Sequence, residues 1–156
     1  MITASRSLPW LLPHSQRRPS LLGALFLALA CHSSPSPSPT SLTDVAWQLV
    51  TLDGLEAGQG AGGQPATLLL GADHRASGFA GCNRFSGTYE LAGDQLSFGP
   101  LAMTRMACTE GMDLEQRFSK VLQATKNYRV SATGLELMDG EKLLAHLVPP
   151  PTATTY

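Results

Sequence analysis

Between residues 42 and 149 the hydrophobic positions form short runs, most of which alternate with polar residues and end at glycine-containing turns. Alternation over short runs is typical of half-buried strands. The expected strands cover residues 45–51, 66–70, 76–80, 85–91, 95–98, 101–106, 128–130, 135–138 and 143–148. Asp139-Gly140 separates the last two and is a strong hairpin-turn signal. Strands that recur with turns between them predict an antiparallel sandwich or barrel.

One segment has a helical period instead. Its apolar side chains fall on one face of a helix: Leu114, Phe118, Val121 and Leu122. Asp113 is placed as the N-cap and Gln116 as its capping-box partner, so the helix is expected from about Asp113 to Ala124. The predicted fold is therefore α+β and mainly β, a small antiparallel β-barrel-like domain with one helix packed on it. The side chains expected in its core are Trp47, Leu69, Phe79, Phe85, Tyr89, Phe98, Phe118 and Leu137.

Residues 58–65 (GQGAGGQP) are rich in glycine and are expected to form a flexible loop between the first two strands. A phosphate-binding loop is the alternative for such a stretch. The segment lacks the Lys-Ser/Thr of that motif and no helical pattern follows it, which weighs against phosphate binding.

The first thirty residues have the pattern of an export signal. Arg6, Arg17 and Arg18 precede an apolar run over residues 21–30, and no acidic residue occurs before that run. The run is shorter than the ~20 apolar residues of a membrane-spanning helix. Its end, Ala28-Leu29-Ala30-Cys31, resembles the lipobox of bacterial lipoproteins, in which the cysteine is lipidated and becomes the new N-terminus. Residues 1–30 are therefore expected to be a lipoprotein signal peptide, and Cys31 the lipidation site.

Three alternatives remain for this region. One is a plain signal-peptidase cut near Ala30 that leaves Cys31 as a free thiol, and another is a buried helix of the fold. The third is export through a twin-arginine signal, which the Arg17-Arg18 pair would serve. A free N-terminal thiol in an oxidising compartment is a liability, which favours lipidation.

Residues 31–41 are expected to tether the domain to a membrane. The stretch from His32 to Thr40 reads HSSPSPSPT, which cannot form a helix and should extend as a semi-rigid spacer. By resemblance to Gram-negative lipoproteins, His32 rather than Asp after the cysteine permits export to the outer membrane. The expected location is the cell envelope, lipid-anchored and facing the periplasm. Residues 150–156 are expected to be a disordered tail.

Charge narrows the classes of partner. Cleavage after Ala30 removes three arginines, which changes the net charge from −1 to about −4. A mildly acidic domain gives no electrostatic reason to bind nucleic acid or an anionic lipid surface.

Four motifs, in order, resemble the META domain family, which is also known from the heat-shock protein HslJ. They are Trp47-Gln48-Leu49, Gly81-Cys82-Asn83-Arg84-Phe85-Ser86-Gly87-Thr88-Tyr89, Thr104-Arg105-Met106-Ala107-Cys108, and a helix containing Phe118 and Leu122. The resemblance covers residues 42–149 and implies a small barrel-like α+β fold. It implies little about mechanism, although bacterial members are mostly envelope proteins connected with stress or antibiotic tolerance.

The motif residues are expected to be structural: Trp47, Gly81, Asn83, Phe85, Gly87, Tyr89, Thr104 and Met106. Gly81 and Gly87 suit a bulge or a close backbone approach, and the Asn83 side chain can satisfy backbone groups at a bend. Once Cys31 is lipidated, Cys82 and Cys108 are the cysteines left to pair in an oxidising compartment. A disulfide between them should stabilise the domain by roughly 3–4 kcal/mol.

Alternative chemistry finds little support. A zinc site would need His74 and His146 as well, and neither lies at close ligand spacing to a cysteine. The cysteine spacing is also not that of a Cys-x-x-Cys redox pair. Arg84 and Arg105 could bind an anion, although solvated surface charge is the simpler interpretation. No nucleophile motif occurs, and paired acids among Asp73, Glu90 and Glu110 remain open.

We therefore expect a non-enzymatic envelope lipoprotein, without cofactor or metal, that supports stress or antibiotic tolerance through binding. Its expected partners are the membrane, through the lipid anchor, and an envelope protein. The alternative function is a small periplasmic binding module, either a hydrolase inhibitor or a carrier of an apolar ligand.

Overall fold

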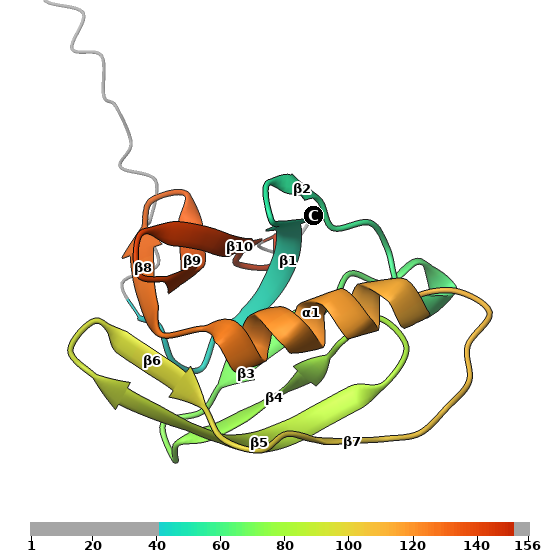
Figure 1. Cartoon of the computed structure of the whole chain (residues 1–156), viewed down its shortest axis with the longest axis horizontal. Helices are drawn as coiled ribbons and strands as arrows, with labels where there is room; N and C mark the ends of the chain where they lie inside the picture. Colours follow the sequence, from blue (N-terminus) through green and yellow to red (C-terminus); the bar gives the residue numbers. More distant parts are fainter. Residues whose placement is uncertain (1–40, 152–156) are drawn as a thin grey trace, which may run out of the picture. The chain divides into compact units, whose positions relative to one another are not determined.

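The computed structural model describes residues 41–151, which form one domain of short strands and a helix (Figure 1). The strands are β1 (Ala46–Leu52), β2 (Leu55–Glu56), β3 (Thr67–Leu70), β4 (Arg75–Phe79), β5 (Arg84–Ala92), β6 (Gln95–Phe98), β7 (Ala102–Met103), β8 (Asn127–Ser131), β9 (Gly134–Asp139) and β10 (Lys142–Val148). The helices are the single-turn 3₁₀ helix η1 (Ala61–Gly63) and the α-helix α1 (Met112–Ala124). The expected signal, Cys31 and the tether up to Thr40 lie outside the described residues, as do the last residues of the expected tail.

Eight of the strands close into an antiparallel barrel. Their order is β1-β3-β4-β5-β6-β8-β9-β10, and β10 pairs with β1 to complete the circle. β2 pairs with β1 at the margin, and β7 pairs with the first half of β5. The predicted fold class is thus confirmed, a mainly β antiparallel barrel with one α-helix among the described residues.

The barrel is joined least extensively between β6 and β8. Their register contains the single pair Gln95 and Asn127. Two backbone hydrogen bonds flank it, from Leu96 N to Lys126 O (3.1 Å) and from Tyr128 N to Asp94 O (3.0 Å). The β1–β10 contact, by comparison, is a long ladder from Gln48–Val148 to Leu52–Ala145.

The helix α1 lies across the barrel and contributes to its core (Figure 1). Its buried side chains are those expected from the sequence: Leu114, Phe118, Val121 and Leu122. The ring of Phe118 meets that of Phe85 edge-on, with 6.2 Å between the centroids. Trp47 is completely buried and its Nε1 donates a hydrogen bond to Leu42 O at 3.0 Å. No helix within residues 41–151 is long and apolar enough to cross a membrane.

Three of the expected core residues lie elsewhere. Leu69 is 36% exposed, because Leu68 and Leu70 occupy the inward positions of β3 and alternation turns Leu69 outward. Phe79 and Phe98 are only half-buried; Phe98 packs against the edge of the core, and Phe79 lines a surface pocket. The other five expected residues are buried: Trp47, Phe85, Tyr89, Phe118 and Leu137.

Two local predictions are wrong. The helix begins at Met112 with Gly111 as its N-cap, and Asp113 makes no capping hydrogen bond; it lies 3.7 Å from Arg117 instead. The run 101–106 forms a strand only over Ala102–Met103, because the chain then turns to follow the β4–β5 connection.

The glycine-rich stretch 58–65 is an ordered turn that follows β2. Gly60 N donates to Gln64 O at 2.8 Å, and Ala61 N donates to Gly81 O at 2.6 Å. The stretch is thus the expected connection before the strand at residues 66–70, and it makes backbone contacts with a distant segment that the sequence did not predict.

Candidate functional site

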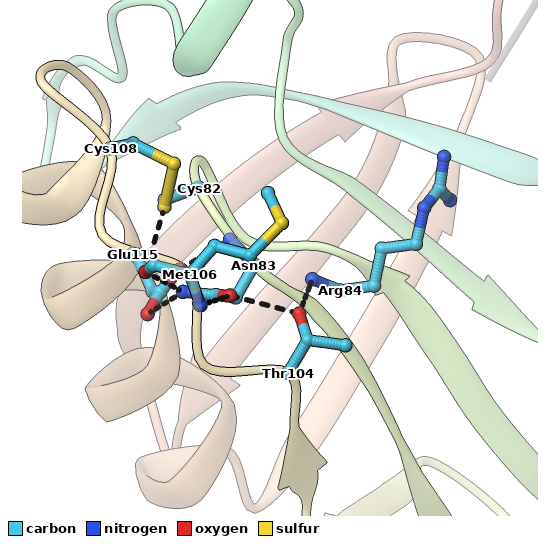
Figure 2. The surroundings of a disulfide bond; sticks show 7 residues. All are labelled: Cys82, Asn83, Arg84, Thr104, Met106, Cys108 and Glu115. Carbon is cyan, nitrogen blue, oxygen red and sulfur yellow. Dashed lines mark hydrogen bonds between the residues drawn. A yellow bond between two sulfur atoms is a disulfide. The ribbon is translucent and has the colours of Figure 1, made fainter.

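The two cysteine-containing motifs meet beside the start of α1 (Figure 2). The connection from β4 to β5 carries Cys82 and Asn83, and the segment from β7 to α1 carries Thr104, Met106 and Cys108. Cys82 and Cys108 form a disulfide with 5.9 Å between their Cα atoms. The predicted pairing is present, and it joins these two segments directly.

The Asn83 side chain is the centre of a polar network. It is 3% exposed, and its Oδ1 accepts hydrogen bonds from Met106 N (2.7 Å) and Thr104 Oγ1 (2.9 Å). Its Nδ2 donates to Met106 O (3.1 Å) and to Glu115 Oε1 (3.2 Å). Asn83 thus pairs with both backbone groups of Met106, as a neighbouring strand would.

Glu115 and Thr104 complete this network. Asn83 N donates to Glu115 Oε2 at 2.6 Å, so both carboxylate oxygens of Glu115 accept hydrogen bonds from one residue. Arg84 N donates to Thr104 Oγ1 at 3.1 Å, and Thr104 N donates to Arg84 O at 3.0 Å. Cys82 Sγ, which carries no proton in the disulfide, lies 3.4 Å from Met106 O. Figure 2 shows Asn83, Thr104 and Glu115 meeting around Met106, while the Arg84 side chain extends away from them.

Glycines allow the backbones to approach closely at the same place. Gly81 has φ +128°, and a Cβ there would lie 2.7 Å from Gly111 O and 3.1 Å from Glu115 N. A Cβ on Gly111 or on Gly60 would collide with the Gly81 carbonyl group in turn. Three separate segments therefore pack backbone against backbone at the first turn of α1, which side chains would prevent.

The remaining motif residues build the barrel rather than this network. A Cβ on Gly87 would lie 2.6 Å from Pro100 O, so Gly87 is the close approach that its sequence context suggests. The Tyr89 hydroxyl donates to Gly71 O at 2.7 Å, and the Tyr89 ring lies 5.5 Å from that of His74. Burial raises the pKa of Tyr89, and the charges of Asp44 and Asp73 raise it further.

Two surface pockets adjoin the network and share Thr104 and Met106. The larger has a volume of about 670 Å³ and lies between residues 101–107 and the start of α1, where Met112 and Glu115 line it. The smaller, of about 310 Å³, lies on the other side of Met106, among Gln64, Phe79 and Arg84. A third pocket of about 340 Å³ is lined by Asp53, Arg117, Lys120 and Lys142.

The candidate chemical groups are not gathered in these pockets. The His74 ring lies tilted beside that of Tyr89, while His146 Nε2 lies 3.1 Å from Thr133 O. Asp73 Oδ1 accepts a hydrogen bond from Arg75 N, and the larger pocket is lined by neither Glu90 nor Glu110. Within residues 41–151 there is no group of three or more His, Cys, Asp and Glu that could hold a metal ion. The acids that line these pockets are Glu115 in the larger one and Asp53 in the third, and neither was among the candidate acids from the sequence.

Comparisons with known proteins agree with this architecture. A model of the META domain family matches residues 40–149, which is more than half of the chain. An NMR structure of a protein from Burkholderia xenovorans is 29% identical, with a TM-score of 0.57; the match covers 76% of this chain and 92% of that one. A second NMR structure is 26% identical with a TM-score of 0.55, over 72% of this chain and 96% of the other. No curated relative matches the chain.

Proposed function

The chain belongs to the META domain family, and from this membership we propose that it is a non-enzymatic envelope lipoprotein that acts by binding another envelope protein. In this proposal the domain supports tolerance of envelope stress or of antibiotics. It stands on a lipid anchor at Cys31, faces the periplasm and is attached to the outer membrane.

One observation carries the binding role, namely that the side chains of Asn83 and Thr104 in the family motifs, and of Glu115 beside them, are already engaged. Asn83 uses its amide on Met106, Thr104 and Glu115, and Glu115 uses both oxygens on Asn83. Groups engaged in this way hold backbone in place and are not free to act as acid, base or nucleophile. The surface beside the Asn83 network contains two pockets. Such a surface supports recognition of a partner protein.

The anchor is supported by the sequence alone. The apolar run over residues 21–30, the Ala28-Leu29-Ala30-Cys31 end and the Ser/Pro stretch after it suit a lipidated and tethered protein. The disulfide suits an oxidising compartment such as the periplasm.

The alternative function as a carrier of an apolar ligand has less support. The barrel is filled by its own side chains: Trp47, Leu52, Leu68, Leu70, Leu96, Phe118, Leu122, Leu135, Leu137 and Leu147 are all less than 2% exposed. The three pockets described above all open at the surface.

Replacing Cys31 tests the anchor. We expect Cys31→Ser to abolish lipidation and to move the protein from the membrane fraction to the soluble periplasmic fraction, since lipid chains supply the attachment. The readouts are fractionation, the mass of the processed chain and survival under envelope stress. Cys82→Ser with Cys108→Ser is the control for fractionation and processing only, because it removes two cysteines and leaves the anchor intact but also removes the disulfide. A Cys31→Ser protein that stays on the membrane with unchanged processing would contradict the proposal.

A further inference from the structure

We propose that the free edge of β7, with the two pockets on either side of Met106, binds an extended acidic and apolar segment of a partner protein by strand addition. This inference rests on the proposed binding function and names its surface and its class of partner. We call residues 101–106, which contain β7, the β7 edge.

The backbone of the β7 edge is paired on one side only. Thr104 N donates to Arg84 O at 3.0 Å, and Met103 lies opposite Phe85 in the register with β5. Hydrogen-bonded positions alternate along an antiparallel ladder, so the N–H and C=O of Met103 point away from β5. Among residues 41–151, β7 pairs with no strand other than β5. Unpaired groups in such a row are a template for another extended chain.

The larger pocket runs beside this free edge. Residues 101–107 line it in unbroken succession, and Met112 and Glu115 of α1 face them. Its volume of about 670 Å³ is within the range of ordinary ligand sites, roughly 300–1,000 Å³. The larger pocket therefore lies next to the unpaired backbone groups of the β7 edge, and strand addition requires both.

Methionine side chains provide apolar contact around the edge. Met106 is 60% exposed and Met112 45% exposed, while Met103 is half-buried in the same pocket. Met106 enters the Asn83 network through its backbone, so its side chain takes no part in the network and lies exposed. Flexible thioethers adapt to partners of varied shape, which suits the recognition of an apolar peptide.

The charges on this surface select an acidic partner. The charged residues that line the two pockets are Arg84, Arg105 and Glu115. Glu115 is engaged by Asn83, and the ion pairs within residues 41–151 involve Arg117, Lys126, Arg129 and Lys142 but neither Arg84 nor Arg105. The two pockets together therefore carry two arginines without an ion-pair partner in the described part of the chain against one carboxylate, and this small excess of positive charge attracts carboxylates.

The test uses the full-length chain in mild detergent and a fluorescein-labelled peptide of alternating Leu and Asp with blocked ends, measured by fluorescence anisotropy. We expect saturable binding that weakens about tenfold with Arg105→Glu, because this change turns attraction into repulsion. The matched control is Arg75→Glu, which makes the same charge change at an exposed position. In the β4–β5 register Arg75 pairs with Thr88, four residues from the Phe79–Arg84 pair beside the smaller pocket. A peptide with Lys in place of Asp, and one N-methylated at alternate amides, should bind at least about tenfold more weakly.

Several results would overturn the proposal. One is that the Leu-Asp peptide does not bind. Another is that Arg105→Glu and Arg75→Glu weaken peptide binding equally. A third is that N-methylation of the peptide leaves its affinity unchanged. Analytical ultracentrifugation could also show that the chain self-associates and that Arg105→Glu abolishes this self-association. That result would mean that the β7 edge binds a second copy of the chain instead. If Arg105→Glu lowers the urea midpoint, its loss of binding could come from lost stability. In that case the weaker binding of the N-methylated peptide to the wild-type chain decides whether strand addition occurs. Membrane attachment through Cys31 is measured in a separate fractionation experiment. A failure of peptide binding at the β7 edge would therefore leave the lipid-anchor proposal unaffected.

Discussion

Asn83 shows how one buried polar side chain can organise separate segments. It pairs with Met106, Thr104 and Glu115, and no buried side-chain nitrogen or oxygen in residues 41–151 lacks a hydrogen-bond partner. The sequence suggested that Asn83 would satisfy backbone groups at a bend. It could not identify Met106 as the backbone partner or Glu115 as the acid, since both lie more than twenty residues along the chain.

The first prediction concerns Asn83→Ala. The substitution leaves both Met106 backbone groups without the Asn83 side chain and removes one of the two hydrogen bonds to Glu115, so we expect a loss of about 2–4 kcal/mol in the free energy of unfolding. Asn127→Ala is the control, because Asn127 also makes two hydrogen bonds, both to Gly140, but at an exposed site. We expect about 1 kcal/mol there, measured by urea denaturation. Equal losses in the two variants would contradict a special role for Asn83.

The second prediction follows from Tyr89. Its pKa is raised above 10.0 by burial and by Asp44 and Asp73, so the folded state holds the phenol proton more tightly than the unfolded state. This stabilisation is complete below about pH 10 and is lost as the pH rises through the folded-state pKa. We expect Tyr89→Phe to be less stable by about 1 kcal/mol at pH 7, because it lacks the hydrogen bond to Gly71 O.

Urea denaturation of both proteins between pH 7 and pH 11 measures this effect. The advantage of the wild-type protein over Tyr89→Phe should shrink above about pH 10. An advantage that stays constant or grows over this range would show that the phenol is not protected in the folded state.

Among the elements, the start of α1 differs from its sequence prediction in its N-cap residue. The apolar period identified the buried face correctly, because that face depends on side chains within the helix. The capping pattern placed the start at Asp113, whereas Gly111, with φ 85°, is the N-cap. Contact with Gly81 decides this end of the helix, and a local capping rule cannot include that contact.

The third prediction compares two glycines. Gly81→Ala should lower the free energy of unfolding by about 3 kcal/mol or more, because it combines an unfavourable φ with a collision against Gly111 O. Gly93→Ala is the matched control, since Gly93 has φ +62° but open space around it, and about 1–2 kcal/mol is expected. Thermal and urea unfolding of both variants measure the difference. If Gly93→Ala costs as much as Gly81→Ala, close packing at the helix start is not the cause.

At the scale of the whole domain, closure of the barrel is uneven. The β6–β8 contact has one register pair, whereas β1–β10 and β9–β10 have long ladders. Local openings require less free energy where fewer hydrogen bonds and contacts must break. The side of the barrel between β6 and β8 should therefore open before the rest.

The fourth prediction is a pattern of amide exchange. The amides of Leu96 and Tyr128, which bond across β6 and β8, should exchange by local opening and faster than those of Leu49 in β1, which donates to Ala66 O, and Leu147 in β10. Native-state hydrogen exchange by NMR, at low concentrations of denaturant, measures this order. If all four amides exchange only through global unfolding, the β6–β8 contact is as stable as the rest of the barrel.

The sequence by itself determined the strand pattern, the buried helix face, the family resemblance and the candidate cysteine pair. These features depend on periodicity and on short motifs, which a linear reading can detect. Tertiary structure decided that the barrel closes through β1 and β10, that Leu69 faces outward and that residues 58–65 are held against Gly81. It also brought Asn83, Met106 and Glu115 together, because hydrogen bonds between distant segments form only once the fold has placed their backbones side by side.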